Sequence, residues 1–152
     1  MKIIRDRERT VDLGAFLLRP LFAHLATASK DGPRESPVWF LWEDEALWII
    51  GDERTDTFPK RIRAEPRCAV GIIDFNVLTG RVKHIGMRGR SAVVPFDANR
   101  ARRLLRRYLG EDEKLWDVGF RNALENPNTL LVRFMPETVV ARDVSFQPSL
   151  ES

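Results

Sequence analysis

Residues 22–52 read FAHLATASKDGPRESPVWFLWEDEALWIIGD, and this stretch decides the fold class. Three runs rich in apolar and aromatic residues are separated by two short polar stretches, KDG at 30–32 and EDEA at 43–46. Asp-Gly adopts positive-φ turn positions at little steric cost, so it is a strong hairpin signal. The stretch therefore predicts three successive antiparallel strands, at 21–29, 33–42 and 47–52.

Short helices are predicted on both sides of this meander. Thr10 is the expected N-cap of a first helix, which Pro20 closes. A second helix is expected to begin at Asp56 or Thr57, because Pro59 then lies in its first turn, where a proline is tolerated. Both helices are therefore expected to be brief, the first before the meander and the second after it.

The clearest helix is predicted at residues 97–109. Asp97 is a suitable N-cap, and Gly110 follows the last turn, where glycine commonly ends a helix. Between them, apolar residues recur at the spacing of a stripe that faces a core, namely Ala101, Leu104, Leu105, Tyr108 and Leu109. A weaker helix is expected at about 113–125.

The remaining apolar runs predict four more strands, at 67–75, 82–94, 129–136 and 137–145, with Pro136 separating the last two. Strands with a few inserted helices predict a mainly β, α+β fold, a small β-barrel with helical decorations. Regular alternation of strands and helices is missing, which excludes a doubly wound sheet. A chain of 152 residues is the size of one domain.

The charge pattern argues against a nucleic-acid-binding protein. The 25 Lys and Arg residues are nearly balanced by 22 Asp and Glu, which leaves a net charge of +3. Several arginines gather in the predicted helix 97–109, at positions that its apolar stripe leaves free: Arg100, Arg102, Arg103, Arg106 and Arg107. They lack the interleaved aromatic residues of single-strand binders. We interpret them as a solvated helix face.

Neither a metal site nor a familiar catalytic motif is evident. Cys68 is the single cysteine, which excludes an intrachain disulfide, and a reducing cytoplasm is the expected compartment. His24 and His84 are the only histidines and have no ligand partner at a recognisable spacing. The charged start MKIIRDRERT does not resemble a secretory signal, and the longest apolar runs are far short of a membrane span. Any chemistry is therefore expected to come from a cofactor or from scattered polar groups.

Trp39, Trp42 and Trp48 crowd into one predicted hairpin. Large aromatic side chains are the main apolar material of a small core, so core packing is one interpretation. A flat wall beside a flat ligand is the other. The two interpretations are compatible.

Residues 49–66, IIGDERTDTFPKRIRAEP, combine the end of a strand with a candidate anion site. Hydroxyl and cationic side chains gather around the predicted helix start, namely Arg54, Thr55, Thr57, Lys60 and Arg61. A helix start carries unpaired N–H groups and a partial positive charge, so it favours anions. A capped surface helix without a ligand is the alternative interpretation.

The order of these segments resembles the pyridoxamine 5′-phosphate oxidase-like, FMN-binding split-barrel family. The matching segments are LATASKDGPRESPVWF at 25–40, the short apolar strand that ends at Ile50, the helix start with its hydroxyls and cations, EPRCAVGI at 65–72, and KHIGMRGRSAVV at 83–94. The resemblance implies a six-stranded split barrel that forms a homodimer, with FMN bound in clefts between the subunits. It also implies an FMN-dependent oxidoreductase, whose small-molecule substrate the sequence does not identify.

The resemblance assigns cofactor contacts to particular residues of this chain. The strand whose backbone edges the flavin ring comprises Ser36, Pro37, Val38, Trp39, Phe40 and Leu41. Ile50 and Gly51 match the strand end beside the ribityl chain. The phosphate region comprises Arg54, Thr55, Thr57, Lys60 and Arg61. His84, five residues before Gly89, falls where such proteins often place a glutamine that reaches the flavin.

The chain departs from the family pattern in two places. Pro59 interrupts the usual cluster of serine, cation and lysine. The end of the chain, VVARDVSFQPSLES, lacks the Arg-Leu-His motif that holds the substrate of the oxidase proper, so the chain is not expected to be the pyridoxamine 5′-phosphate oxidase itself. The alternative from another class is a non-enzymatic carrier or sensor that binds a flavin, a deazaflavin or haem.

Overall fold

One sheet of eight strands organises the described part of the molecule. The computed structural model describes residues 1–7 and 11–149, with residues 3–7 as backbone alone. The sheet order is β3-β2-β6-β7-β8-β5-β4, and β1 pairs with β8 outside this path. The strands are β1 (Lys2–Arg7), β2 (Ala23–Ser29), β3 (Gly32–Val38), β4 (Leu41–Glu43), β5 (Ala46–Asp52), β6 (Arg67–Asn76), β7 (Arg81–Val94) and β8 (Thr129–Asp143). β1 and β8 are parallel and the other neighbouring pairs are antiparallel, which confirms the mainly β, α+β fold.

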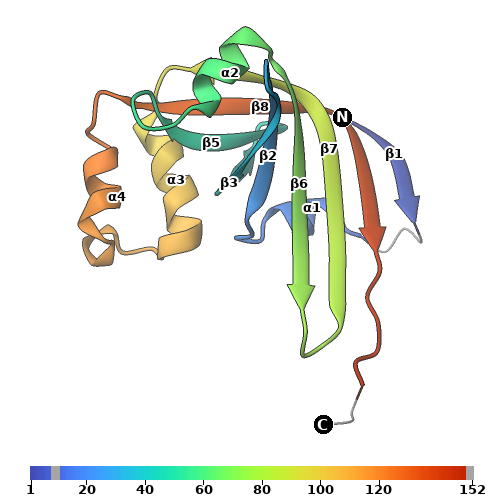
Figure 1. Ribbon diagram of the computed structural model, residues 1–152. Helices are drawn as coiled ribbons and strands as arrows, with labels where there is room; N and C mark the ends of the chain where they lie inside the picture. The colour runs from blue at the N-terminus through green and yellow to red at the C-terminus, as the bar shows by residue number, and fades with distance from the viewer. Residues whose placement is uncertain (8–10, 150–152) are drawn as a thin grey trace.

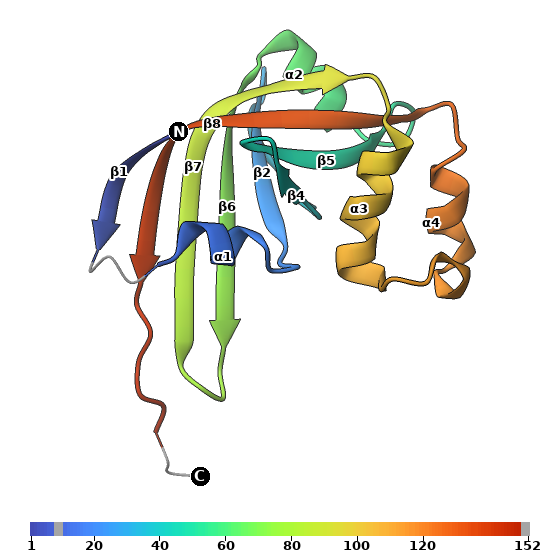
Figure 2. The same cartoon turned by 180° about the vertical axis from the view of Figure 1, so that it is seen from behind.

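Short helices cover the ends of the curved sheet (Figure 1). They are α1 (Leu13–Leu17), α2 (Phe58–Ala64), α3 (Ala98–Leu109), the 3-10 helix η1 (Glu113–Leu115) and α4 (Val118–Ala123). α2 lies near one end of β2 and β6, while α3 and α4 lie side by side at the start of β8. The reverse view shows α1 near the start of β2, at the opposite end of that strand from α2, while β6 extends beyond it (Figure 2). α3 has the predicted cap and end, because the Asp97 side chain accepts N–H bonds from Asn99 and Arg100, and Gly110 has a φ of 99°.

α1 begins at a different cap from the predicted one. Asp12 is its N-cap and accepts an N–H bond from Ala15 at 3.1 Å, whereas Thr10 lies outside the described residues. α2 follows Thr57 as expected, with Pro59 in its first turn, although the Thr57 side chain makes no capping bond. None of the described helices is long and apolar enough to cross a membrane.

Two clusters of buried apolar residues hold the fold together. The larger fills the barrel, and Leu25, Phe40 and Phe134 are among its fully buried members. The smaller joins β4, β5 and β8 to α3 and includes Trp48 and Leu104. Burying one large apolar side chain, such as that of Leu or Phe, contributes about 1.5–3 kcal/mol to the folding stability. The apolar stripe that the sequence predicts on α3 therefore fastens this helix to the sheet.

The prediction of one continuous strand at residues 36–41 is wrong. β3 ends at Val38 and β4 begins at Leu41, and these two strands form opposite ends of the sheet order. The chain has to leave one end of the sheet and join the other, so it breaks at Trp39 and Phe40. α3 stabilises this break, because the Phe40 N–H donates to the Tyr108 hydroxyl at 3.1 Å.

β8 runs through Pro136 as a single strand, so the prediction of two separate strands is wrong. Pro136 pairs with Gly89, and the register shifts between Arg88 and Gly89, which leaves Glu137 as an extra residue on β8. Such a bulge tolerates a proline within a sheet. Gly89 is required at this position, since a Cβ there would lie 2.1 Å from the Met135 carbonyl oxygen.

The weaker helix predicted at about 113–125 is divided into η1 and α4. Trp116 lies between the two and is buried, and its indole N–H donates to the Gly110 carbonyl at 2.8 Å. Asp117 then caps α4 by accepting the Gly119 N–H at 2.9 Å. The buried tryptophan thus interrupts a segment whose local pattern suits one helix.

The arginines of α3 do not form the solvated face that the sequence predicts. Arg107 donates to the carbonyl oxygens of Leu17 at 3.2 Å, of Arg19 at 2.8 Å, and of Phe40. Burial lowers the pKa of the Arg107 guanidinium from its ordinary value. Three further arginines form ion pairs with carboxylates of the 43–44 turn or of η1: Arg100, Arg102 and Arg103. These cations hold α3 against the sheet and its neighbouring segments.

Candidate functional site

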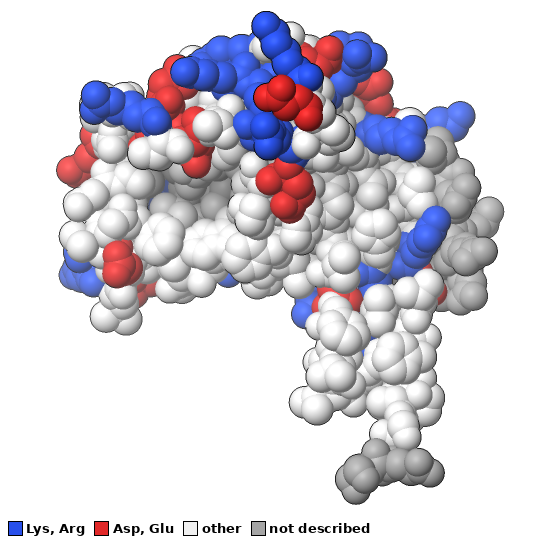
Figure 3. Space-filling view, in the orientation of Figure 1, with Lys and Arg blue, Asp and Glu red and all other residues white. Residues whose placement is uncertain are grey.

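A cavity of about 590 Å³ lies between β3, β5 and the helices α3 and α4. We call it the aromatic cavity, because Phe22, Trp39, Phe58 and Phe120 line it. Figure 3 shows a hollow on this face, between the helical end of the molecule and the sheet. Small-molecule sites commonly span about 300–1,000 Å³, so the cavity is large enough for a ligand.

Trp39 is held firmly in the wall of the aromatic cavity. Its ring stacks on Tyr108 with a centroid separation of 4.5 Å and an interplanar angle of 2°, and on Phe120 at 5.4 Å and 16°. The Tyr108 hydroxyl donates to the Leu21 carbonyl at 2.7 Å, and burial raises the pKa of Tyr108. Trp48, in contrast, belongs to the buried core. Trp48 therefore fits the core interpretation, whereas Trp39 lines a cavity, and the interpretation of a wall beside a flat ligand stays a prediction.

Five residues that the family resemblance assigns to the flavin line this cavity: Pro37, Val38, Trp39, Ile50 and Gly51. The other residues of the predicted ring strand lie elsewhere. Ser36 pairs with Leu25 of β2, Phe40 is buried in the barrel, and Leu41 belongs to the cluster beneath α3. The break between β3 and β4 explains this division, since it turns the two parts of the segment in different directions.

The turn before α2 supplies its own partners for its backbone N–H groups. Asp52 Oδ1 accepts the N–H groups of Arg54 at 2.7 Å and of Thr55 at 3.0 Å, and these bonds hold the pKa of Asp52 below its ordinary value. The Asp52 N–H in turn donates to Asp56 Oδ2 at 2.7 Å. Arg54 and Thr55 are exposed, so they offer their side chains and not their N–H groups to a ligand.

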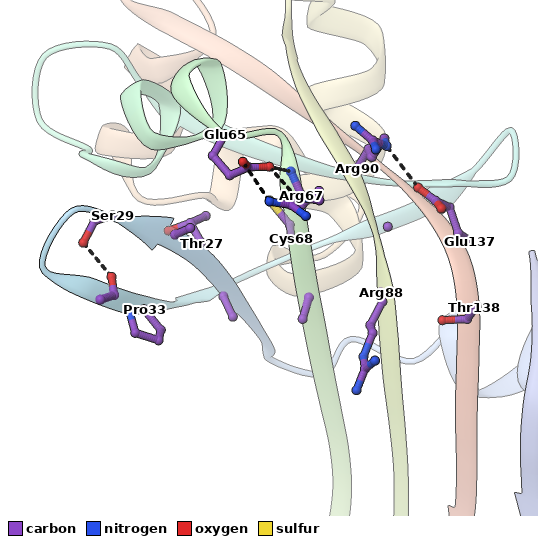
Figure 4. Close-up of a pocket in the computed structure, with 15 residues that line it drawn as sticks. Thr27, Ser29, Pro33, Glu65, Arg67, Cys68, Arg88, Arg90, Glu137 and Thr138 are labelled. Atoms are coloured by element: carbon purple, nitrogen blue, oxygen red, sulfur yellow. Dashed lines mark hydrogen bonds and ion pairs between the residues drawn. The ribbon is translucent and has the colours of Figure 1, made fainter.

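A second cavity, of about 810 Å³, lies on the outer face of the sheet over β2, β6, β7 and β8 (Figure 4). We call it the outer cavity. Arg67 pairs with Glu65 at 2.9 Å, and Arg90 pairs with Glu137 at 3.4 Å, while Arg88 points away from both pairs. Thr27, Ser29, Thr138 and Cys68 are also among its lining residues, although Thr27 and Cys68 are themselves buried. Most of its positive charge is therefore already neutralised by carboxylates.

Arg61 of α2 bonds to a lining residue of the outer cavity and to the turn beside the aromatic cavity. Its Nε donates to Thr27 Oγ1 and its Nη1 donates to Thr57 Oγ1, both at 2.7 Å. Thr27 lines the outer cavity, whereas the neighbours of Thr57 in sequence, Asp56 and Phe58, line the aromatic cavity. Within residues 1–7 and 11–149, no carboxylate forms an ion pair with Arg61 or with the exposed Lys60. Arg61 is thus a fixed cation whose charge is uncompensated.

His84 lies on β7 and lines neither cavity. It pairs with Ile73 of β6 and with Arg142 of β8. Burial, and then the charge of Arg142, lowers the pKa of His84 from its ordinary value. Within one chain, His84 is therefore not brought to the residues predicted to hold the flavin ring.

Helix α4 contributes residues that the sequence reasoning missed. Asp117, Gly119, Phe120 and Ala123 line the aromatic cavity opposite β3 and β5. Nothing local in the sequence 117–123 indicates a ligand site, because only the packing of α4 beside the sheet brings it there. Asp56, inside the predicted phosphate region, and Asp52, two residues before that region, line the same cavity.

Comparison with solved structures finds the same fold in other proteins. A conserved hypothetical protein of Mycobacterium tuberculosis has a TM-score of 0.76 at 14% identity, over 100% of this chain and 98% of its own. The haem storage protein HutZ of Vibrio cholerae has a TM-score of 0.67 at 16% identity, over 86% and 92% of the two chains. A FAD-binding protein of Mesorhizobium loti has a TM-score of 0.58 at 19% identity, over 86% and 90%. These likenesses establish the split-barrel fold.

Comparison at the level of sequence identifies the family. None of the curated protein sequences matches this chain. The family model described as pyridoxamine 5′-phosphate oxidase matches residues 12–142, from the start of α1 almost to the end of β8. The chain belongs to the pyridoxamine 5′-phosphate oxidase family.

Proposed function

We propose that this protein binds FMN, with the flavin ring in the aromatic cavity and the phosphate at Arg61, and that it is an FMN-dependent oxidoreductase. The observation that carries the proposal is the meeting of Pro37, Val38, Trp39, Ile50 and Gly51 around one cavity beside a stacked aromatic wall. Membership of the family and the likeness to a FAD-binding protein support a flavin as the ligand.

The aromatic cavity suits a flat, largely apolar ring. Trp39 is fixed by its stacking on Tyr108 and Phe120, so a ring that packs against this wall does not have to order it first. Contacts between aromatic rings contribute about 0.5–1.5 kcal/mol beyond the apolar area that they bury. Gly51 keeps the strand end close to its surroundings, since a Cβ there would lie 3.1 Å from the Phe58 ring.

Arg61 suits a phosphate better than any other cation described near the aromatic cavity. Two neutral hydroxyls orient its guanidinium, and a phosphate accepts charge-assisted bonds from such a group. Lys60 is exposed beside it and adds a second charge. The carboxylates of Asp52 and Asp56 line the aromatic cavity itself, so the phosphate would lie on the Arg61 side of them.

The chain's own contribution to catalysis is binding, orientation and exclusion of water. A bound flavin supplies hydride transfer at its N5 atom. Trp39 and Phe120 would hold the ring, and residues of α3 and α4 line the same cavity. We assign no acid or base to a reacting atom. A non-enzymatic flavin carrier would bind FMN in the same way, and turnover with a reductant and an acceptor separates the two functions.

A homodimer forms part of the proposal. Large apolar side chains lie exposed on β6, on its turn to β7 and on the segment after β8: Ile73, Phe75, Val77, Leu78, Val144 and Phe146. Figure 3 shows that the face below α2 carries few charges. Large exposed apolar surfaces of this kind commonly mark interfaces. In a dimer that buries this face, His84 would lie near the subunit contact.

Light scattering tests the assembly. We expect a dimer at micromolar concentrations, and we expect Ile73→Glu combined with Phe75→Glu to yield a monomer, because two buried charges in an interface are costly. A wild-type protein that is monomeric while it holds its cofactor would contradict the dimer.

The cofactor is tested by comparing FMN with riboflavin, which lacks only the phosphate. Absorbance of the purified protein shows whether a flavin copurifies, and a Soret band would indicate haem instead. In a fluorescence titration, FMN is expected to bind more tightly by on the order of 2–4 kcal/mol, because the phosphate gains charge-assisted bonds. Equal affinities would overturn the phosphate assignment while leaving a flavin site in place.

A further inference from the structure

The aromatic cavity is acidic as well as aromatic. Asp52, Asp56 and Asp117 line it, and no Lys, Arg or His of the described residues does so. Asp52 and Asp56 lie at the end of β5 and in the turn that follows, whereas Asp117 lies at the start of α4, on the opposite side of the cavity from β3 and β5. A ligand in the cavity therefore meets carboxylates contributed by two elements far apart in the sequence.

These three carboxylates have no ion-pair partner in the described part of the chain, although the charge of Arg54 contributes to the lowered pKa of Asp52. Each caps backbone N–H groups through one of its oxygens: Asp52 those of Arg54 and Thr55, Asp56 that of Asp52, and Asp117 that of Gly119. None of the three forms an ion pair among residues 1–7 and 11–149. Several carboxylates elsewhere are paired with arginine, such as Glu43, Glu65 and Asp74.

We propose that the aromatic cavity accepts a second ligand beside the flavin ring, and that this ligand is a small aromatic cation. The flavin would lie on the wall of β3 and β5, and the cation between the ring and α4. Phe120 and Asp117 are its expected contacts on α4, since a cation is attracted both by an aromatic face and by a carboxylate. The position of this ligand rests on the proposed function, whereas its charge follows from the lining of the cavity alone.

The charge selection is expected to be moderate. Asp117 is exposed and Asp52 and Asp56 are half-buried, so solvent and salt weaken each interaction. Three like charges around one cavity nevertheless act in the same direction, attracting a cation and repelling an anion of the same shape. Added salt is therefore expected to reduce the preference.

Benzamidine, benzamide and benzoate test the proposal, because they share one ring and differ mainly in charge. Each is titrated into the FMN-loaded protein, and binding is followed by ligand-observed NMR and by the flavin spectrum. We expect benzamidine to bind about tenfold or more tightly than benzoate, with benzamide between them. Raising the salt concentration should narrow that ratio.

Two substitutions locate the charge. Asp117→Asn and Asp56→Asn keep a side-chain oxygen for the backbone N–H and remove the charge, so both variants should fold. Each is expected to weaken benzamidine about threefold or more and to leave benzamide within about twofold. Asp112→Asn is the matched control, because Asp112 caps the Lys114 N–H at 3.0 Å in the same way and does not line the cavity. It should change neither ligand.

The outcomes separate this proposal from the flavin assignment. The proposal that the ligand is a cation would be overturned by equal affinities for benzamidine and benzoate. It would also be overturned if Asp117→Asn and Asp112→Asn changed the affinity for benzamidine equally. Displacement of FMN by benzamidine would overturn the claim that the cation binds beside the flavin ring while FMN is bound. A protein that takes up no FMN would contradict the proposed function instead, and the same titrations on the free protein would then decide whether the cavity selects a cation.

Discussion

The helices α2 and α3 are both rich in arginine, yet their cations meet different partners. On α3, Arg107 donates to three carbonyl oxygens, and Arg100, Arg102 and Arg103 pair with carboxylates. On α2, Arg63 pairs with Glu53, whereas Arg61 donates to the hydroxyls of Thr27 and Thr57 and has no ion-pair partner among residues 1–7 and 11–149. An anion therefore finds an available cation on α2 and largely committed cations on α3. The comparison teaches that the partners of a cation, and not the number of arginines on a helix, decide whether the cation is available to an anion.

The largest expected effect is the loss of folding stability when Arg107 is replaced. Arg107→Ala should reduce the free energy of unfolding by about 3 kcal/mol, because bonds from a charged donor contribute about 1.5–3 kcal/mol each and are not additive. Urea denaturation followed by circular dichroism measures this change. Arg61→Ala is the comparison, with a smaller expected loss, since it removes bonds to two hydroxyls, those of the buried Thr27 and the exposed Thr57, instead of bonds to three carbonyl oxygens. Equal losses would contradict the distinction between the two arginines.

The next effect concerns binding. Lys60→Ala combined with Arg61→Ala should weaken FMN at least about tenfold, which corresponds to the ~1.4 kcal/mol of one lost charge-assisted bond. Riboflavin binding should stay within about twofold, because it has no phosphate to lose. Flavin fluorescence at two salt concentrations measures both affinities.

Arg102→Ala combined with Arg106→Ala provides the matched pair on α3. It removes the same charge and should leave FMN binding within about twofold, since these residues line neither cavity. A larger loss for the α3 pair than for the α2 pair would move the phosphate site away from Arg61.

The smallest expected effect is a pH dependence of the folding stability that comes from His84. Burial and Arg142 lower the pKa of His84 in the folded chain, so the unfolded chain binds more protons at acidic pH. The protein should therefore lose stability as the pH falls below about 6.5, the ordinary pKa of histidine, and retain this contribution above it. His84→Gln should weaken that dependence. Urea denaturation at pH 7.5 and 5.5 measures this dependence. The same change in the free energy of unfolding between the two pH values, for the wild type and for His84→Gln, would contradict the prediction.

Much of the fold was predictable because its signals are local. The Asp-Gly turn after β2 and the apolar runs beside it depend on neighbouring residues, and β2 and β3 form there as expected. Asp97 and Gly110 likewise bound α3, since a cap and a glycine act within one turn of the helix. The family resemblance, confirmed over residues 12–142, rests on the order of such segments.

The errors occur where distant segments meet. The break at Trp39 and Phe40 exists because β3 and β4 lie at opposite ends of the sheet, and no nearby residue signals it. Pro136 remains inside β8 because Gly89, on another strand, allows the backbone to approach closely. Local patterns could not indicate either arrangement, since each depends on a partner strand.

The sequence alone determined the strand-rich fold, the limits of α3 and the segments that carry the candidate cofactor residues, because turns, caps and apolar spacing act over a few residues. Tertiary structure decided which residues share a cavity and which cations remain available. It brought Asp117, Phe120 and Ile50 to the same cavity. It also brought Arg107 within hydrogen-bonding distance of carbonyl oxygens, whereas Arg61 donates to two hydroxyls. The physical reason is that charge compensation and concavity depend on neighbours in space, which only the packing of helices against the sheet brings together.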